Sequence, residues 1–321
     1  MPSIYEQAQQ FRANLVKRDT AAIEYLTDQY KEVYSRILRA LVGINNQIAE
    51  AQRNGETVSK AWLNQQWRYQ SFLRQLDQEF QVYANTLNQT VTARQAFETL
   101  QGGRDAAAMI GGRFDRLPVV ALENIIGNLR AESPLAKLLD SFGPVASQHV
   151  ATTLRDAIAL GHNPRKIAGQ VRDALGVPLH RALTIARTES NRAYRQASLN
   201  SMQNAGVEQW RWIAAKSSRT CLNCLARDGE IYTAKKPFPA HPNCRCVIAP
   251  MTDSSPVRAE AASKWFEKQP DSVKRQMMSG IAFDLYKQGK IKLADFKGDG
   301  HSRKWGPYTY ERSVKEILTE R

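Results

Sequence analysis

All four cysteines of the chain lie between residues 221 and 246, and this clustering constrains the fold more than any other feature. They form two short motifs, Cys221-x-x-Cys224 and Cys244-x-Cys246, and His241 stands shortly before the second motif. Two such turns point soft, deprotonable side chains at one spot, which is what a tetrahedral zinc ion requires. The sequence therefore predicts that this segment folds around a zinc ion.

The cluster offers more candidate ligands than a tetrahedral ion has positions. We expect two similar pairs, Cys221 with Cys224 and His241 with Cys244, and Cys246 competes for the last position. Four protein ligands leave no open position for a catalytic water, so a structural role is expected for the zinc. Its binding would supply on the order of 10 kcal/mol to a small module that otherwise lacks a core.

Two other states of the cysteines are possible. Four cysteines allow a pair of disulfides, as expected in a secreted chain, and free thiols are the third possibility. The first residues, Met1 to Gln10, show no basic and then apolar signal pattern, so the sequence favours folding in a reducing cytosol. Spacing and compartment together favour zinc.

The length and charge of the chain limit the class of protein to which it can belong. A chain of 321 residues with 42% hydrophobic content is long enough for two or three packed units. No window is apolar enough to span a membrane, so no membrane partner is expected. The formal charge is +14, and residues 1–100 hold 11 Lys/Arg and 10 Asp/Glu, so nearly all of the excess lies beyond them. A polyanion, most commonly nucleic acid, suits that part, although a solubilising basic surface is the alternative.

The fold class is predicted to be mainly α, and residues 1–100 are predicted to form a long helical hairpin with coiled-coil character. Two apolar stripes follow 3-4 spacing, on either side of a polar break at residues 54–59. The stripes would pack on each other within the chain, although a partner protein could cover one of them. Their members are Ile23, Leu26, Tyr30, Val33, Ile37, Ala40, Ile44, Tyr69, Leu73, Leu76, Phe80, Tyr83 and Leu87.

The hairpin is expected to lead through a linker into a helical core. Residues 101–146 are predicted to be a linker or wrapping region, because glycines and prolines such as Gly102-Gly103, Pro118 and Gly127 break it into short helices and turns. Residues 147–205 are predicted to form three helices. Asn163 and Pro164 fit the start of one of them, and Gly176 fits a stop.

The core, residues 147–251, is expected to end in a small β-containing zinc module at residues 210–250. After a boundary near residue 252, a basic and helical tail is predicted for residues 252–321, with a Gly-rich loop at residues 298–307. The short strands expected in the module are 210–213, 231–233 and 247–248.

The run Ala186-Arg-Thr-Glu189 lies on one of the predicted helices. Arg187 and Glu189 are separated by about 200 degrees around a helix, so they must face different partners. Glu189 and Arg192 would form an ordinary surface pair at spacing i,i+3. The alternative is that Arg187 or Glu189 reaches across to support the zinc module.

These motifs together resemble the Mu F-like minor head proteins, or head morphogenesis proteins, of tailed bacteriophages. The resemblance covers roughly residues 134–250 and leaves the first hundred residues uncovered. The residues that carry it are Ala186-Arg-Thr-Glu189, Ala193, Trp212, Thr220-Cys-x-x-Cys224, Asp228-Gly229, His241-Pro-Asn-Cys-Arg-Cys246 and Pro250.

The resemblance implies a low-copy structural protein of the phage head at the portal vertex, acting in head morphogenesis, DNA packaging and delivery. Its partners would be the portal protein or the major capsid protein, and packaged double-stranded DNA bound without base specificity. It would be found in the virion, and in the host cytoplasm during assembly. The residues expected to support the metal ligands are Arg187, Glu189, Asp228 and Arg245. The residues expected to contact DNA are Arg192, Arg195, Lys235 and Lys236.

Two rival functions follow from the same residues. A zinc-dependent nuclease would use His241 and an open metal site to activate water, and a sequence-specific regulator would need a base-reading helix. The sequence contains no Ser-His-Asp elbow, phosphate-binding Gly-Lys-Ser/Thr loop or dinucleotide fingerprint. Some family members carry a fused toxin or ADP-ribosyltransferase domain, and the tail here shows no such motif. We therefore expect a structural protein and not an enzyme.

Overall fold

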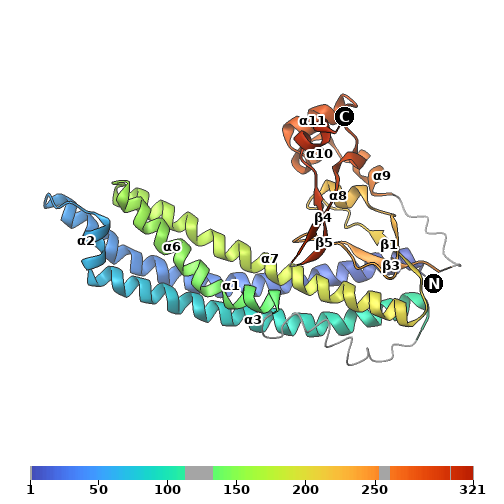
Figure 1. The fold of residues 1–321 in the computed structure, drawn as a ribbon, viewed down its shortest axis with the longest axis horizontal. Coiled ribbons are helices and arrows are strands. Elements are labelled where there is room, and N and C mark those ends of the chain that lie inside the picture. Colours follow the sequence, from blue (N-terminus) through green and yellow to red (C-terminus); the bar gives the residue numbers. More distant parts are fainter. Residues whose placement is uncertain (1, 113–132, 253–260, 304, 321) are drawn as a thin grey trace. The chain divides into compact units, whose positions relative to one another are not determined.

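The computed structural model describes residues 2–112, 133–252, 261–303 and 305–320 (Figure 1). These residues are mainly helical, as predicted, with two small antiparallel sheets. The chain groups into two compact units, each assembled from separate stretches of sequence. Unit 1 comprises residues 1–19, 94–127 and 187–321, and unit 2 comprises residues 20–93 and 128–186. Among the described helices, none combines the length and the apolar character needed to cross a bilayer.

Two long helices, α1 (Ile4–Arg53) and α3 (Trp67–Ile110), occupy the segment predicted to be a hairpin, with the short helix α2 (Lys60–Gln65) between them. In unit 2 the apolar stripes of α1 and α3 meet, since the rings of Tyr30 and Tyr83 pack edge to face at 4.9 Å. Tyr83 also donates a hydrogen bond to the carbonyl of Leu26. Within this unit the stripes therefore pack on each other, and a partner is not needed to cover these residues. The stripe residues that are fully buried are Leu26, Tyr30, Val33, Ile37, Ile44, Tyr69, Leu76, Phe80, Tyr83 and Leu87.

From residue 133 the described chain continues in α5 (Pro134–Asp140), α6 (Phe142–Ala159) and α7 (Pro164–Asn204), so residues 147–205 lie in two helices, α6 and α7, and not in the three that were predicted. The predicted start of α7 is confirmed, because Asn163 accepts a hydrogen bond from the backbone N–H of Lys166. The predicted stop at Gly176 is wrong, since α7 continues through Gly176 and Pro178. A proline inside a helix disturbs the carbonyls of the preceding turn. Here the buried hydroxyl of Tyr30 donates to one carbonyl of that turn, the carbonyl of Leu175, from outside the helix.

Gly102 and Gly103 lie inside α3 and do not break it, contrary to the prediction. In unit 1 they pack directly on α7, where Ser198 donates a hydrogen bond to the carbonyl of Gly102. A side chain at Gly102 would overlap the backbone carbonyl oxygen of Tyr194. The two glycines therefore allow close helix contact. The breaks predicted at Pro118 and Gly127 lie outside the described residues.

The three predicted strands form one antiparallel sheet in unit 1. Strand β1 (Gln209–Ile213) lies between β2 (Ile231–Thr233) and β3 (Val247–Pro250). Trp210 and Trp212 on β1 are fully buried in the core of this unit. Alternating buried positions on β1 thus anchor the segment that carries the cysteines.

The tail is helical, as predicted, but it also contains an unpredicted hairpin. Strands β4 (Lys297–Ser302) and β5 (Gly306–Glu311) occupy the segment expected to be a loop. Gly298 and Gly300 on β4 lack side chains where the rings of Tyr310 and Tyr308 lie across the hairpin. Because glycine has no side chain, the two rings can lie directly over the strand. A prediction that assigns glycine-rich segments to loops does not anticipate a strand of this kind. The helices of the tail are α9 (Ala262–Glu267), α10 (Asp271–Met277), α11 (Gly280–Lys287) and α12 (Val314–Thr319).

Candidate metal centre

The first cysteine pair is positioned by a single helical turn. Cys221 is the N-cap of the short helix α8 (Leu222–Ala226), and its sulfur accepts a hydrogen bond from the backbone N–H of Cys224. The N-cap conformation turns the Cys221 side chain back toward the first turn of the helix. Both sulfurs of the pair therefore lie on the same side of α8.

His241 completes a group with this pair. Its Nε2 atom lies 3.2 Å from the sulfur of Cys221 and 3.0 Å from the sulfur of Cys224. On the other side of the ring, Nδ1 lies 2.7 Å from the carbonyl oxygen of Pro242. A carbonyl can only accept, so this contact places the proton on Nδ1 and leaves Nε2 to face the two sulfurs.

The second cysteine pair meets the first at Cys224. The sulfurs of Cys224 and Cys244 are 3.8 Å apart. Two overlapping groups result, Cys221, Cys224 and His241 in one and Cys224, Cys244 and Cys246 in the other, with ligand atoms in each group within 4.8 Å of one another. All four cysteines are described and none of them forms a disulfide, so the disulfide alternative has no support. This Cys/His cluster could hold a metal ion.

The electrostatics of the cluster favour a mixture of thiolates and imidazolium when no ion is bound. Hydrogen bonding from Cys224, helped by His241, lowers the pKa of Cys221 to about 5. Burial lowers the pKa of His241, but hydrogen bonds and charge from the neighbouring sulfurs outweigh it and raise this pKa to about 11. Burial raises the pKa of Cys246. Negative charge therefore lies on the Cys221 sulfur beside the protonated imidazole of His241, and a bound cation would replace the imidazole proton there.

Helix α7 supports the knuckle formed by residues 241–246 through side chains on one of its faces. Arg187 donates from Nη1 to the side-chain oxygen of Asn243 at 2.8 Å and from Nε to Asp19 at 2.8 Å. Thr188 accepts a hydrogen bond from the backbone N–H of Asn243. The knuckle is thus held at both the backbone and the side chain of one residue.

The same face of α7 also binds the carbonyls of the knuckle. Asn191 donates to the carbonyl of Cys244 at 3.1 Å, and buried Arg195 donates to the carbonyl of Cys246 at 3.1 Å. Sequence reasoning missed the roles of Thr188 and Asn191. The signal was available, because positions 187, 188, 191 and 195 recur at intervals that place them on one helical face.

The remaining expected supports do not touch the ligands through hydrogen bonds described in the structure. Glu189 is buried and pairs with Arg192 at 3.5 Å, and burial raises its pKa. Asp228 accepts from the backbone N–H groups of Ala214 and Ala262, so it joins the end of β1 to the start of α9. Arg245 is half-buried, and burial together with the nearby Arg187 lowers its pKa.

The four residues expected to contact DNA fall into two classes. Lys235 and Lys236 are exposed, and the side chain of Arg192 is 35% exposed. Arg195 is only 2% exposed, and its guanidinium packs over the ring of Phe238 and donates to the knuckle. Its geometry is that of a knuckle support, whereas the other three side chains are accessible to a ligand.

Comparison with known proteins relates the segment that contains this site to a protein family. Residues 148–249 match the family described as phage Mu protein F like protein, which confirms the resemblance inferred from the motifs. This match contains all five candidate ligands and the supporting face of α7. An uncharacterized protein of Haemophilus influenzae is 24% identical over 160 residues, which are 44% of this chain and 36% of that protein. The chain therefore spans about a third of the length of that relative. No solved structure matches the chain.

Proposed function

We propose that this chain is a structural protein of a tailed-phage head that acts in head morphogenesis, because residues 148–249 match the phage Mu protein F like family. The observation that carries the proposal is that this match includes the complete Cys/His cluster and the helix face that supports it. We further propose a place at the portal vertex, with the portal protein or the major capsid protein as partner. The long helices α1 and α3 would offer the surface for that contact.

We propose that the metal is zinc and that its ligands are Cys221, Cys224, His241 and Cys244. Around a tetrahedral zinc ion with Zn–S bonds of about 2.3 Å, two sulfurs lie about 3.8 Å apart. The sulfurs of Cys224 and Cys244 have this separation, and His241 presents Nε2 to the first pair. The imidazole of His241 interacts with the sulfur of Cys244 as well as with that of Cys221, which supports Cys244 as the fourth ligand and Cys246 as the spare cysteine.

A zinc ion in this position would join α8 to the knuckle and add its binding free energy to folding. Four protein ligands fill the coordination sphere, so none of its positions would be left for a hydrolytic water. The buried surroundings of Cys224 and Cys244 and the hydrogen bonds from α7 fit a rigid support. This favours the structural role over the nuclease.

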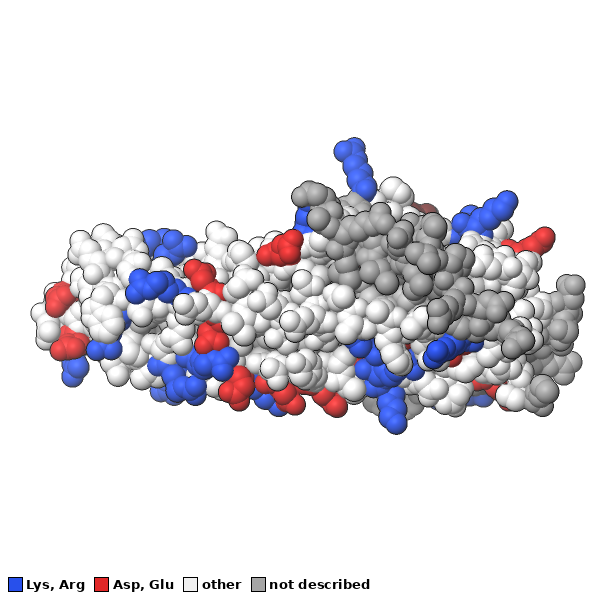
Figure 2. All heavy atoms as spheres, turned by 90° about the horizontal axis from the view of Figure 1, so that it is seen from below, with Lys and Arg blue, Asp and Glu red and all other residues white. Residues whose placement is uncertain are grey.

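The chain's DNA contact is proposed to be local and independent of base sequence. On the face drawn in Figure 2, lysines and arginines alternate with acidic side chains among the coloured residues. Among the described residues of that face, the basic side chains therefore form no single continuous patch. Exposed Lys235 and Lys236, with Arg192, would pair with phosphates near the metal centre.

The decisive experiment is quantitative mass spectrometry of purified particles of the source phage. A head protein at a single vertex should accompany the major capsid protein at a small and constant copy number. Complete absence of the chain from particles would contradict the proposed role. Cleavage of plasmid by purified, zinc-loaded protein would then favour the nuclease instead.

The DNA contact has a separate test. Affinity of the purified protein for duplex DNA should fall steeply as salt is raised from about 50 to about 200 mM, because phosphate contacts release counterions. Replacement of both Lys235 and Lys236 by Gln should weaken binding and flatten this dependence. An affinity that does not change with salt would contradict phosphate contact while leaving the head role intact.

A further inference from the structure

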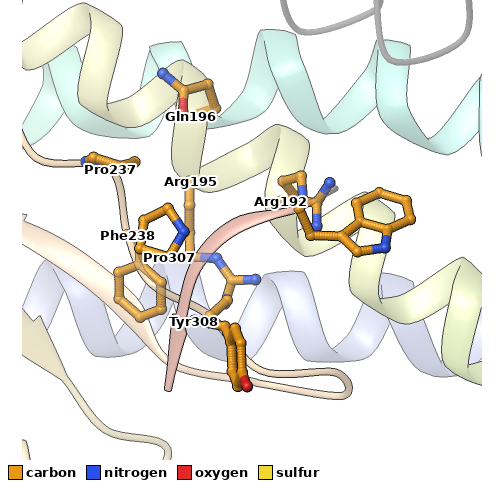
Figure 3. Close-up of a pocket in the computed structure, with 9 residues that line it drawn as sticks. Arg192, Arg195, Gln196, Pro237, Phe238, Pro307 and Tyr308 are labelled. Carbon is orange, nitrogen blue, oxygen red and sulfur yellow. The ribbon is translucent and has the colours of Figure 1, made fainter. Parts of the chain in front are cut away.

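A cavity of about 200 Å³ lies in unit 1 beside the supporting face of α7. Three segments form its walls: α7 with Arg192 and Arg195, the loop before the knuckle with Phe238, and the hairpin segment with Trp305 and Tyr308. Figure 3 shows the labelled side chains from these segments gathered around one space. We propose that this arginine-aromatic pocket binds one unpaired nucleotide of DNA.

The charge of the walls favours an anion. Arg192 and Arg195 both line the cavity, and Arg195 is buried. Glu189 lies 3.5 Å from Arg192, and its carboxylate interacts with both guanidinium groups. Arg195 also donates to the carbonyls of Cys244 and Cys246, so its buried charge adds to the positive wall of the cavity while its hydrogen bonds hold it in place. Arg192, which is partly exposed, is the residue placed to pair with a phosphate.

The aromatic side chains favour a planar group on that anion. Arg192 already stacks on the ring of Trp305 at 4.8 Å, and Tyr308 is 37% exposed. Unpaired bases stack on aromatic rings and on guanidinium planes without regard to base identity. A cavity of this volume is below the range of drug-sized ligand sites, so it admits one small planar group and excludes a base pair within a duplex.

Basic residues beside the pocket would extend the contact along a DNA strand. Exposed Lys235 and Lys236 directly precede Pro237, which is part of the pocket wall. Their turn is fixed, since Gln203 donates to the carbonyl of Ala234 at 2.6 Å. Cations held beside an aromatic slot are the usual arrangement for single-stranded nucleic acid. The inference rests on the DNA contact proposed above and specifies its ligand as an unpaired strand or a frayed DNA end.

Fluorescence anisotropy with the full-length protein tests the pocket. Three labelled probes of equal length are compared: oligothymidine of about 16 residues, an abasic oligonucleotide with the same phosphates, and a blunt duplex. Oligothymidine should bind about fivefold or more tightly than the abasic probe, because stacking adds to phosphate pairing. Trp305→Leu combined with Tyr308→Leu should remove this difference and leave duplex binding unchanged.

Arg192→Gln should weaken binding of oligothymidine about fivefold or more. Arg275→Gln is the matched control, since Arg275 also pairs with a carboxylate, that of Asp284, and stacks on a ring, that of Phe283, away from the pocket. It should leave binding unchanged, and thermal melts should show that all variants remain folded.

The outcomes separate this inference from the proposed function. Equal affinity for oligothymidine and the abasic probe, or pocket variants that bind like the wild type, would overturn the pocket while salt-dependent duplex binding keeps the DNA contact. Failure to bind any of the three probes would overturn both. The pocket would be established if the wild type binds oligothymidine more tightly than the abasic probe and the Trp305→Leu, Tyr308→Leu double variant binds the two probes equally.

Discussion

Arg187 of helix α7 donates a hydrogen bond of 2.8 Å to the side chain of Asn243, and Asn243 is the one non-glycine residue of the described chain with a positive φ, 62°. Asparagine tolerates this left-handed conformation better than other residues with side chains. The bond therefore joins the sharpest backbone turn of the knuckle to a long helix. Because Cys244 follows Asn243 directly, the helix helps to fix where that sulfur points.

Substitutions at Asn243 should separate backbone conformation from the contact with Arg187. Asn243→Gly keeps the left-handed turn but loses the hydrogen bond, so we expect about a tenfold loss of zinc affinity. Asn243→Ala loses both, and the left-handed backbone costs about 1 kcal/mol more. Competition with a chelating dye measures both affinities. Equal affinities of the two variants would mean that the backbone turn does not matter for metal binding.

Asn243 is a better target than Arg187 for this purpose. Arg187 also pairs with Asp19, whose side chain is almost fully buried and whose pKa is raised by burial. Removing the arginine would leave an unpaired carboxylate in the interior and destabilise the fold as a whole. A loss of metal affinity in that variant could not be assigned to the knuckle.

The cysteine assignment predicts unequal effects of serine substitutions. Cys224 belongs to both groups of the cluster, so Cys224→Ser should abolish stoichiometric zinc binding and lower the melting temperature strongly. Cys246→Ser should retain one zinc per chain if Cys246 is spare. Elemental analysis with thermal melts, before and after treatment with a chelator, measures both effects.

Retention of zinc by Cys224→Ser, or its loss in Cys246→Ser, would contradict the assignment in different ways. The first result would remove Cys224 from the site. The second would make Cys246 a ligand in place of His241 or Cys244. His241→Ala distinguishes those two cases, because a site made of four cysteines does not need the imidazole.

Local patterns in the sequence predicted the parts of the fold that depend on neighbouring residues. The stripe from Leu26 to Ile44 has helical spacing and is buried except at half-buried Ala40, and the alternation around Trp210 and Trp212 forms the central strand β1. The cysteine motifs likewise brought the candidate ligands together, because two tight turns determine most of that geometry.

The errors occurred where distant residues decide the local structure. Pro178 remains inside α7, and a carbonyl of the preceding turn, that of Leu175, accepts a hydrogen bond from Tyr30, far away in the sequence. Gly298 and Gly300 form a strand because tyrosine rings from β5 occupy the space above them. A glycine or proline signal gives only the local preference, and the tertiary partner that overrides it cannot be read from spacing.

The buried carboxylate of Glu189 predicts a pH-dependent effect. Burial raises its pKa in the folded state, so ionisation is more favourable in the unfolded chain and the carboxylate lowers stability at pH values above its folded pKa. Glu189→Gln should therefore stabilise the protein at pH 8 by about 1 kcal/mol, and this gain should shrink as the pH falls toward about 4.5. Urea unfolding of both proteins at each pH measures the difference.

The control for Glu189→Gln is the same change at Glu208, which is exposed and should show little effect at any pH. Destabilisation of Glu189→Gln at pH 8 would show that attraction to Arg192 and Arg195 outweighs the burial of the charge. A gain that is equal at both ends of the pH range would show that the effect is steric and not electrostatic.

Close contact between α3 and α7 in unit 1 depends on Gly102. A methyl group there would overlap the carbonyl oxygen of Tyr194, which belongs to the helix backbone and cannot rotate away. Gly102→Ala should therefore destabilise the protein by about 2 kcal/mol, although alanine is the better helix former by about 1 kcal/mol.

Gly169→Ala is the matched control, because nothing lies within 4 Å of the added methyl group in α7. That change should stabilise the protein by about 0.5 kcal/mol, and denaturant unfolding of the two variants should move in opposite directions. If both variants were stabilised, the two helices would have to be further apart than the hydrogen bond from Ser198 to Gly102 allows.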